Sequence, residues 1–266
     1  MIVIKIGGGK NINLESVSSD IASINKPIII IHGGNYYLDK YSKELGIEKK
    51  MLTLPFGLKS RYTTQETIDL MYMTYAGLAN KKIVASLANN NINAIGMSGI
   101  DGKLIIGKRH PALISQEGEK RIVVKDDLTG SVKSINTDLI KSFLDQGLVP
   151  VITPPVITED GVVINVDGDK IASKIATEMS AKTLILLIEA AGIMTDLEDK
   201  DSLIKNVNKE NLEELLAVVK GRMKRKLMEC IKLLDSGIEK IIIADGRIES
   251  PISAALAGGG THIYES

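Results

Sequence analysis

Residues 2–10 of the chain have the sequence IVIKIGGGK, a short apolar run with a lysine near its end and three glycines after it. A nearly continuous β-branched run predicts a strand that is buried on both faces. Glycines at a strand end let the backbone approach an anion and direct several N–H groups at it, and Lys5 adds a positive charge there. The stretch matches neither the phosphate-loop nor the dinucleotide glycine pattern. An anion site and a simple tight turn are therefore both open interpretations.

A second glycine turn, IHGGN at residues 31–35, follows the next predicted strand and precedes a helical pattern. In open parallel sheets, ligands bind outside the carboxyl ends of the strands. Two glycine turns on two strands therefore predict a cradle with room for two anionic groups. We interpret His32 as a supporting hydrogen-bonding residue rather than a catalytic base.

Short apolar runs alternate with amphipathic helical patterns along the rest of the chain. We predict strands at 2–6, 28–31, 93–96, 149–152, 183–188 and 241–244, and helices at 14–24, 65–87, 138–146, 169–179 and 223–234. This alternation predicts an α/β fold with a mostly parallel central sheet sandwiched by helices. Two β-hairpins are predicted as insertions at the sheet edge. One joins 103–109 to 120–125 with Gly118 in the connection, and the other joins 155–157 to 162–165.

The composition excludes several classes of function. The 266 residues carry 33 basic and 33 acidic side chains, and this zero net charge argues against a nucleic-acid binder. One cysteine (Cys230) and three histidines exclude an intramolecular disulfide and argue against a protein-held metal site. No apolar run approaches the roughly 20 residues that a membrane helix needs. We therefore expect a cytoplasmic protein that binds neither nucleic acid nor membrane.

Two further segments carry candidate binding groups. Arg61 precedes the long helical pattern at 65–87 and suits bidentate binding of a carboxylate, although a solvated arginine is the alternative. The segment Asn165–Asp169 opens the next helix. One interpretation is that the Asn165 amide binds substrate and a carboxylate of this segment organises nearby lysines. The other is that Asp167 or Asp169 caps the helix.

Residues 221–226, GRMKRK, place four cations in five positions at the start of a predicted helix. Positive charge at a helix N-terminus opposes the helix dipole, so a compensating anion is expected there. A bound polyphosphate supplies that anion, whereas a solvated charged face is the alternative.

Taken together, these motifs resemble the amino acid kinase superfamily, and within it the acetylglutamate kinases. The resemblance covers nearly the whole chain and rests on the order of the motifs: the Lys5 glycine turn, the turn at 32–34, Arg61, the Asn165/Asp169 segment, and Met223 with Lys226 three residues later. The segments at 60–63, 99–102, 165–169 and 221–226 are closer to the carrier-protein branch, the [LysW]-aminoadipate/[LysW]-glutamate kinases.

The resemblance implies an N-terminal lobe, 1–180, for the acyl substrate and dimerisation, and a C-terminal lobe, 181–266, for ATP. It implies that Lys5 and Lys226 stabilise the transition state, that Asp169 orients them, and that the Gly8 N–H holds the transferring phosphoryl group. The amino-acid part is expected at Gly33, Gly34, Arg61 and Asn165, and the nucleotide at Lys5, Gly7, Gly8, Lys224 and Lys226. Mg²⁺ is expected to bridge the phosphates, and the sequence indicates no protein ligand for it.

The sequence departs from the family pattern at two places. Asn35 stands where a third glycine usually follows the second turn, which indicates a different substrate shape. Residues 187–192, LIEAAG, replace a stretch that usually carries a hydroxyl and an Asp or Asn. The nucleotide contacts of that stretch therefore cannot be carried over.

The implied reaction transfers the γ-phosphoryl group of ATP to a side-chain carboxylate of aminoadipate or glutamate. A carboxylate is already ionised at neutral pH and needs no general base. The α-amine must be blocked, because a free amine attacks its own activated carboxyl group. In this branch the block is an acidic carrier protein. We interpret six basic residues as its docking surface on the first hairpin, with a solvated hairpin as the alternative: Lys103, Lys108, Arg109, Lys120, Arg121 and Lys125.

One helix face cannot bury Met71, Tyr72, Met73 and Tyr75 together, which predicts contact with a second copy in a homodimer. Three other interpretations stay open: an N-acetylglutamate kinase, another kinase of the superfamily that acts on carbamate or uridylate, and a non-catalytic metabolite sensor.

Overall fold

The computed structural model describes residues 1–55, 59–117, 120–196, 199–208, 211–218 and 221–264. Its main sheet has the strand order β14-β16-β15-β13-β1-β2-β10-β5. These strands are β1 (Ile2–Ile6), β2 (Ile28–His32), β5 (Ala94–Ser98), β10 (Val149–Thr153), β13 (Thr183–Ile188), β14 (Asn206–Val207), β15 (Lys240–Asp245) and β16 (Thr261–Tyr264).

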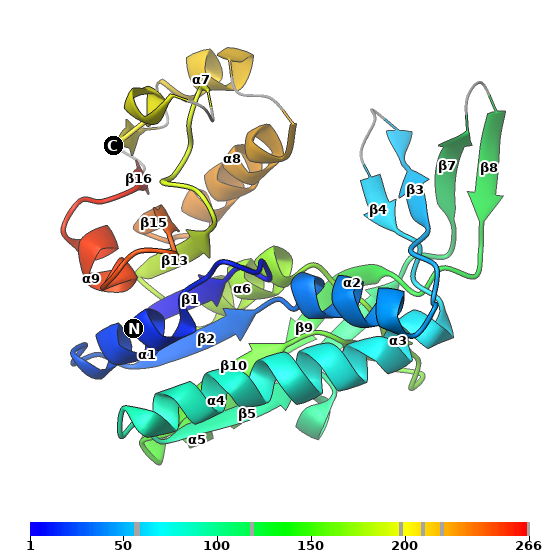
Figure 1. Cartoon of the computed structure of the whole chain (residues 1–266), viewed down its shortest axis with the longest axis horizontal. Helices are drawn as coiled ribbons and strands as arrows, with labels where there is room; N and C mark the ends of the chain where they lie inside the picture. The colour runs from blue at the N-terminus through cyan, green and yellow to red at the C-terminus, as the bar shows by residue number, and fades with distance from the viewer. Residues whose placement is uncertain (56–58, 118–119, 197–198, 209–210, 219–220, 265–266) are drawn as a thin grey trace.

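Among the described strands, the sheet is parallel from β5 to β15, and its far edge runs the other way: β16 is antiparallel to β15, and β14 is parallel to β16. β1 lies in the middle, where Ile4 pairs with Ile30 on one side and with Ile185 on the other. Its apolar side chains are buried on both faces, as the sequence indicated. The prediction of an α/β fold with a mostly parallel sheet between helices is confirmed (Figure 1).

Helices cover both faces of the sheet. α1 (Leu14–Ala22), α4 (Asn80–Asn89) and α9 (Pro251–Leu256) pack on the face that Ile2, Ile4 and Ile6 share. α5 (Thr137–Asp145), α6 (Gly168–Glu178) and α8 (Gly221–Leu234) pack on the opposite face, where Val3 lies. Because side chains alternate along a strand, Lys5 points to this second face. The alternation thus directs the lysine toward α6.

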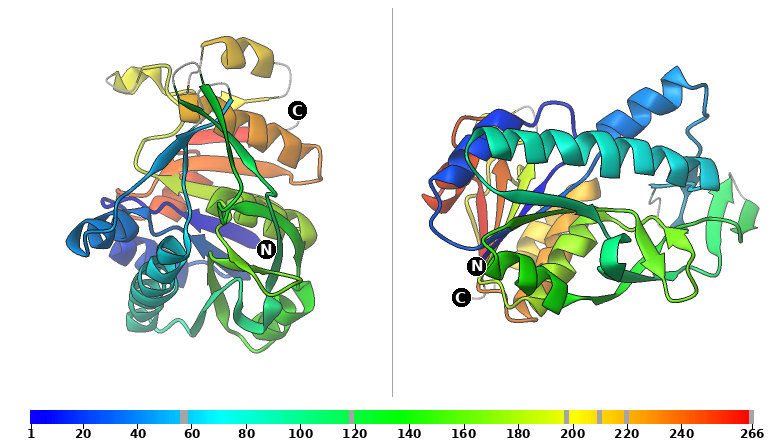
Figure 2. Two further views of the ribbon diagram at one scale, coloured as in Figure 1. Left: turned by 90° about the vertical axis from the view of Figure 1, so that its right-hand side faces the viewer. Right: turned by 90° about the horizontal axis from the view of Figure 1, so that it is seen from below.

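The middle of the chain forms smaller sheets rather than extensions of the main sheet. One is four-stranded, with the order β12 (Val163–Ile164), β11 (Val156–Thr158), β6 (Ile105–Arg109) and β9 (Gly130–Ile135). Two hairpins project from the body: β3 (Met51–Thr53) with β4 (Lys59–Arg61), and β7 (Leu113–Glu117) with β8 (Lys120–Val124) (Figures 1 and 2).

The predicted hairpin between 103–109 and 120–125 is therefore wrong, whereas the one between 155–157 and 162–165 is confirmed. β6 pairs with β9 and β11, and β8 pairs with β7 instead. The sequence pattern favours 103–109 because this segment has three consecutive apolar residues, KLIIGKR, whereas β7, LISQE, has only two. Gly118, placed in that connection, lies outside the described residues.

The long helical pattern at 65–87 forms one rod with a change of winding in its centre. It consists of α3 (Gln65–Met71), a π-helical segment η2 (Tyr72–Ala79) and α4. A π-turn adds a residue and rotates the side chains that follow. Met71 and Tyr75 are buried against Leu38 of α2 (Asn35–Glu44), whereas Tyr72 and Met73 are 39% and 54% exposed.

The remaining described elements are the helix α7 (Leu212–Val218) and the short 3₁₀ turns η3 (Asp101–Lys103) and η4 (Lys200–Ser202). Within the described ranges, no helix has the length and apolar character needed to cross a membrane.

Candidate active site at the carboxyl ends of β1 and β2

The two glycine turns touch each other backbone to backbone. A Cβ atom on Gly8 would lie 2.8 Å from the backbone nitrogens of Gly34 and Asn35, and one on Gly33 would lie 3.2 Å from Gly8. The Tyr36 N–H donates to the Gly8 carbonyl at 2.9 Å. The Gly7 N–H donates to the Leu187 carbonyl at 2.9 Å, so its hydrogen bond joins β1 to β13. The cradle expected from the sequence is thus built of backbone, and only glycine fits at position 8.

Lys5 and Asp169 form an ion pair in the site. The Lys5 Nζ lies 2.7 Å from Asp169 Oδ1, and the two side chains are 13% and 21% exposed. Asp169 lies in the first turn of α6, and its N–H donates to Oδ1 of Asp167, which is the N-cap. Asp167 therefore caps the helix, and Asp169 pairs with Lys5. The role of Asp169 in orienting lysines for catalysis stays a prediction.

His32 is a buried neutral residue beneath the second turn. Its Nδ1 lies 3.0 Å from the Gly33 carbonyl and its Nε2 lies 3.0 Å from Nδ2 of Asn80. Because a carbonyl only accepts, Nδ1 carries the proton and Nε2 accepts from Asn80. Burial lowers the pKa of His32 to about 4, with a further lowering from Lys5 and Lys81. The ring is therefore uncharged at neutral pH, and both of its nitrogens are used in hydrogen bonds within the protein.

Asn80 is a site residue that the sequence analysis missed. It is fully buried, and its Nδ2 also donates to the Val151 carbonyl at 2.9 Å. Both of its N–H bonds are therefore used, one on His32 and one on β10. Nothing in the local pattern of α4 distinguishes this asparagine from a surface one, because its partners lie far away in the sequence.

Arg61 lies in β4 and reaches back to helix α2. Its Nη2 donates to Asp39, which also accepts from Lys49 at 2.7 Å. Burial of Asp39 opposes ionisation, but the hydrogen bonds from Lys49 and Arg61 outweigh it and lower the pKa of the carboxyl. The side chain of Arg61 is only 12% exposed. It is a positioned arginine rather than the solvated one that the alternative interpretation assumed.

Tyr75 contacts the second glycine turn, a position that no pattern in the sequence predicted. Its hydroxyl donates to Oδ1 of Asn35 at 2.8 Å, and its ring packs against the Cα of Gly34. Burial raises its pKa well above the usual value, and Arg61, Asp39 and Asp167 all act on it electrostatically. Tyr75 therefore lies between the second glycine turn, which it contacts, and charged groups of β4, α2 and the loop before α6 that act on it electrostatically.

Asn165 lies in the loop between β12 and α6. Its backbone N–H donates to the Leu128 carbonyl at 2.8 Å, and its carbonyl accepts from the Gly130 N–H at 3.0 Å. The backbone is thereby fixed and the side chain is half buried. Asn165 lies three residues before α6 begins at Gly168, and its role in substrate binding stays a prediction.

The basic segment at 221–226 forms the first turns of α8, which packs on the same face of the sheet as α6. Lys224 is exposed. The side chain of Lys226 lies outside the described residues, so its meeting with Lys5 stays a prediction.

Glu189, in the stretch that departs from the family pattern, contacts the first glycine turn. The Asn11 N–H donates to its Oε1 at 2.5 Å, and a Cβ atom on Gly9 would lie 2.3 Å from its carboxyl carbon. The departure therefore adds a carboxylate that holds the end of the glycine turn against β13.

Comparison with known proteins shows what the chain resembles. The family model described as amino acid kinase family matches residues 1–245. The chain belongs to the amino acid kinase family.

Relatives of this amino acid kinase match it over nearly its whole length. A protein of Thermus thermophilus named [LysW]-aminoadipate kinase is 39% identical and covers 98% of the chain and 99% of its own length. A [LysW]-aminoadipate/[LysW]-glutamate kinase of Metallosphaera sedula is 36% identical, and the match covers 99% of this chain and 100% of that protein. The resemblance stated from the motifs is confirmed at the level of the family.

Solved structures show the same fold at low identity. Carbamate kinase of Giardia is 17% identical with a TM-score of 0.66 and covers 100% of the chain and 98% of its own. N-acetylglutamate synthase of Neisseria gonorrhoeae, complexed with coenzyme A and N-acetyl-glutamate, is 19% identical with a TM-score of 0.80. The chain covers 59% of the length of that synthase.

Proposed function

We propose that this protein is an ATP-dependent kinase that phosphorylates the side-chain carboxylate of aminoadipate, glutamate or both, with the α-amine of the substrate linked to an acidic carrier protein. The reaction belongs to lysine biosynthesis and, with glutamate, to arginine biosynthesis in the cytoplasm. The observation that carries the proposal is the Lys5–Asp169 ion pair at the glycine turns, in a chain that matches carrier-dependent kinases over nearly its full length.

The chemistry suits these residues. Phosphoryl transfer to a carboxylate brings two anions together, so positive charges and N–H groups lower the barrier and no base is required. Lys5 supplies a charge that Asp169 holds in place, and Gly8 supplies a backbone turn that admits no side chain. His32 remains neutral beneath them. In this proposal Lys226 contributes a second cation from α8, and Lys224 and Gly7 lie toward the nucleotide.

Mg²⁺ neutralises phosphate charge during the transfer. Over the described ranges, no group of three or more His, Cys, Asp or Glu side chains could hold a metal ion. We therefore propose that Mg²⁺ arrives with the ATP phosphates and is held mainly by them and by water, as is usual for this ion.

The carrier docks, in this proposal, on the basic surface of the projecting hairpin β7–β8 and the adjacent strand β6. Lys120, Arg121 and Lys125 are exposed on and after β8, and Lys108 is exposed on β6. The six cations named from the sequence do not share one hairpin, because Lys103 lies in η3 and Lys108 and Arg109 lie in β6. Arg109 donates to the carbonyls of Asp127 and Lys125, so it supports the base of the hairpin.

A charge-reversal experiment tests this docking surface. The double variant Lys120→Glu/Arg121→Glu is expected to raise the KM for the carrier-linked substrate at least tenfold at low salt, with the KM for ATP unchanged. Lys182→Glu, an exposed lysine that pairs with Glu239 away from the hairpin, is the control. Wild-type KM should also rise with ionic strength, because salt screens exposed charges. A KM insensitive to salt and to both reversals rejects the hairpin as the docking surface.

The reaction itself is tested by trapping acyl phosphate with hydroxylamine in the presence of ATP and Mg²⁺. N-acetylglutamate, carrier-linked glutamate and carrier-linked aminoadipate serve as parallel acceptors. Product from the linked acceptors alone supports the proposal and ranks the two amino acids. Product mainly from N-acetylglutamate supports an N-acetylglutamate kinase instead, and binding of ATP and acceptor without product supports a metabolite sensor.

A further inference from the structure

Asn35 is an exposed residue whose side chain is held in one orientation by Tyr75. The Tyr75 side chain is only 6% exposed, and its hydroxyl donates to Asn35 Oδ1 at 2.8 Å. A buried hydroxyl needs an acceptor for its proton, so the oxygen of the amide faces the tyrosine. The Nδ2 group then points away from Tyr75. Within the described residues, the structure gives Nδ2 no hydrogen bond.

The position of Asn35 places this free amide beside the expected point of phosphoryl transfer. Asn35 is the first residue of α2, and its backbone nitrogen lies 2.8 Å from where a Gly8 Cβ would be. A neutral N–H donor can orient a carboxylate without removing the negative charge with which the carboxylate attacks. The N-terminus of α2 adds a small positive potential at the same place.

Helix α2 also holds Arg61 at a fixed distance from Asn35. Asp39, which binds Arg61, follows Asn35 by four residues and lies on the same face of the helix. Four residues span about 6 Å along a helix. An acceptor that reaches from Asn35 to Arg61 therefore meets two groups whose spacing is set by one helical turn.

We propose that Asn35 binds the accepting carboxylate through Nδ2, and that Asn35 and the Asp39-held Arg61 together set the chain length of the acceptor. This inference rests on the proposed function and deepens it. Tyr75 is the positioning residue for Asn35. It lies in the π-helical segment η2, so the winding of that segment places the tyrosine at the glycine turn. Glutamate and aminoadipate differ by one methylene, a difference that a fixed spacing of two binding groups can discriminate.

The variant Asn35→Asp separates binding from a structural role. Aspartate keeps the oxygen that Tyr75 needs but replaces the N–H donor with a negative charge. The inference predicts that kcat/KM for the carrier-linked acceptors falls about 100-fold, as expected for a lost hydrogen bond to a charged group with added repulsion. The KM for ATP and the affinity for ADP should stay unchanged. A purely structural asparagine predicts that this variant behaves as wild type.

Tyr75→Phe is the second variant, because it keeps the ring against Gly34 and removes only the hydroxyl. It is expected to lower kcat/KM about tenfold for the better acceptor and less for the poorer one. The ratio of the kcat/KM values for carrier-linked glutamate and carrier-linked aminoadipate then moves toward one. If Asn35→Asp loses ADP binding, Asn35→Ala decides the question, with an expected loss of about tenfold.

The outcomes distinguish the inference from the proposed function. A wild-type protein that phosphorylates none of the acceptors rejects the proposed function. An active wild type together with Asn35→Asp or Asn35→Ala variants that keep kcat/KM within twofold rejects the inference alone. An unchanged acceptor ratio in Tyr75→Phe rejects the length-setting role.

Discussion

Lys5 illustrates how one strand position determines which partner a side chain meets. It lies between Ile4 and Ile6, which are buried on the α1–α4 face, so alternation sends the lysine to the face where α6 begins. Asp169 meets it there at 2.7 Å. A partly buried lysine with one carboxylate partner keeps a single geometry, which is what transition-state stabilisation requires.

Replacing Lys5 by alanine is expected to lower kcat by about two to three orders of magnitude, by analogy with loss of an oxyanion-hole donor. The KM for the acceptor should change little, because the acceptor is bound elsewhere in the site. Hydroxamate formation under saturating ATP measures the effect. Lys182→Ala, an exposed surface lysine, is the control. Near-normal turnover by Lys5→Ala would falsify the assignment of this lysine.

The neutral state of His32 predicts a pH dependence of stability. Its pKa is about 4 in the folded protein and about 6.5 in an unfolded chain. Between these values the unfolded chain binds a proton that the folded chain does not, so the free energy of unfolding falls as the pH decreases from 6.5 to 4. The loss reaches about 3 kcal/mol at the lower end.

Denaturant unfolding at pH 7 and pH 4.5 measures this loss. The variant His32→Gln has no titrating ring and is expected to lose less stability over the same interval, even if it is less stable at pH 7. Equal losses in the two proteins would show that other groups control the acid sensitivity.

At the scale of elements, the two projecting hairpins are joined at their base by hydrogen bonds to the Asp127 carboxylate. This carboxylate is 2% exposed and accepts from the Thr63 N–H at 2.9 Å, after β4, and from the Thr129 N–H at 2.8 Å, after β8. The Leu128 N–H donates in turn to the Thr63 carbonyl at 2.8 Å. The strand that carries Arg61 is thereby joined to the hairpin proposed to receive the carrier.

The variant Asp127→Asn is expected to lower the free energy of unfolding by about 1–3 kcal/mol, because an amide N–H₂ then faces a backbone N–H. It should also raise the KM for the carrier-linked acceptor without changing the KM for ATP. Asp126→Asn is the matched control, because Asp126 is exposed and contacts the Tyr62 hydroxyl rather than the backbone. If both variants shift the acceptor KM equally, the tie at Asp127 does not matter for docking.

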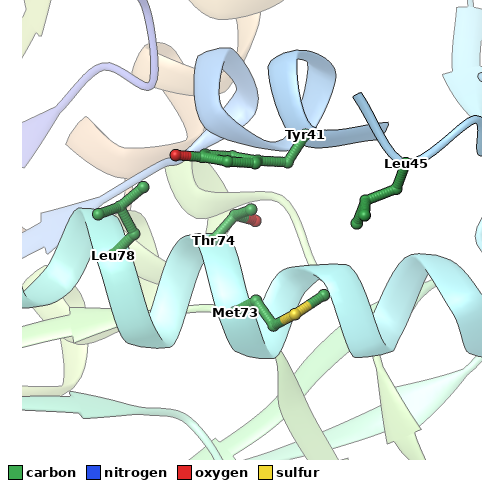
Figure 3. Close-up of a pocket in the computed structure, with 5 residues that line it drawn as sticks. All are labelled: Tyr41, Leu45, Met73, Thr74 and Leu78. Carbon is green, nitrogen blue, oxygen red and sulfur yellow. The ribbon is translucent and has the colours of Figure 1, made fainter. Parts of the chain in front are cut away.

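At the scale of the whole molecule, one apolar surface lies open on the side of the long rod. A pocket there is lined by Tyr41 of α2, by Leu45 just after that helix, and by Met73, Thr74 and Leu78 of η2 (Figure 3). Leu45 and Met73 are 58% and 54% exposed. This surface supports the homodimer proposed from the Met and Tyr residues of the rod.

A charge in that surface is expected to separate the two copies. In sedimentation, the wild type should be a dimer and Met73→Glu a monomer at the same concentration, because burying an unpaired carboxylate in an apolar contact is unfavourable. Ile248→Glu, at an apolar residue 43% exposed in another part of the molecule, should leave the dimer intact. A monomeric wild type rejects the dimer.

The sequence predicted those parts of the site that depend on strand ends and missed those that depend on packing between distant elements. The carboxyl ends of β1 and β2 must meet in a parallel sheet, so the contact of Gly8 with Gly33 followed from the pattern. Tyr75, Asn80 and Asp39 reach the site only through helix packing and a π-turn, neither of which leaves a periodic signal. The predicted strand partner of residues 120–125 was wrong, because which short inserted strands pair with each other depends on the packing of the whole region and not on local sequence.

The central place of β1 has a consequence for the order in which the chain folds. β1 is made before the other described strands, yet one of its two neighbours is β13, which ends at Ile188. Until that later segment emerges from the ribosome, an isoleucine-rich strand has an open edge that other chains can pair with. Contacts between such distant segments also form slowly. Synthesis at high concentration or temperature is therefore expected to favour aggregation through this open edge over folding.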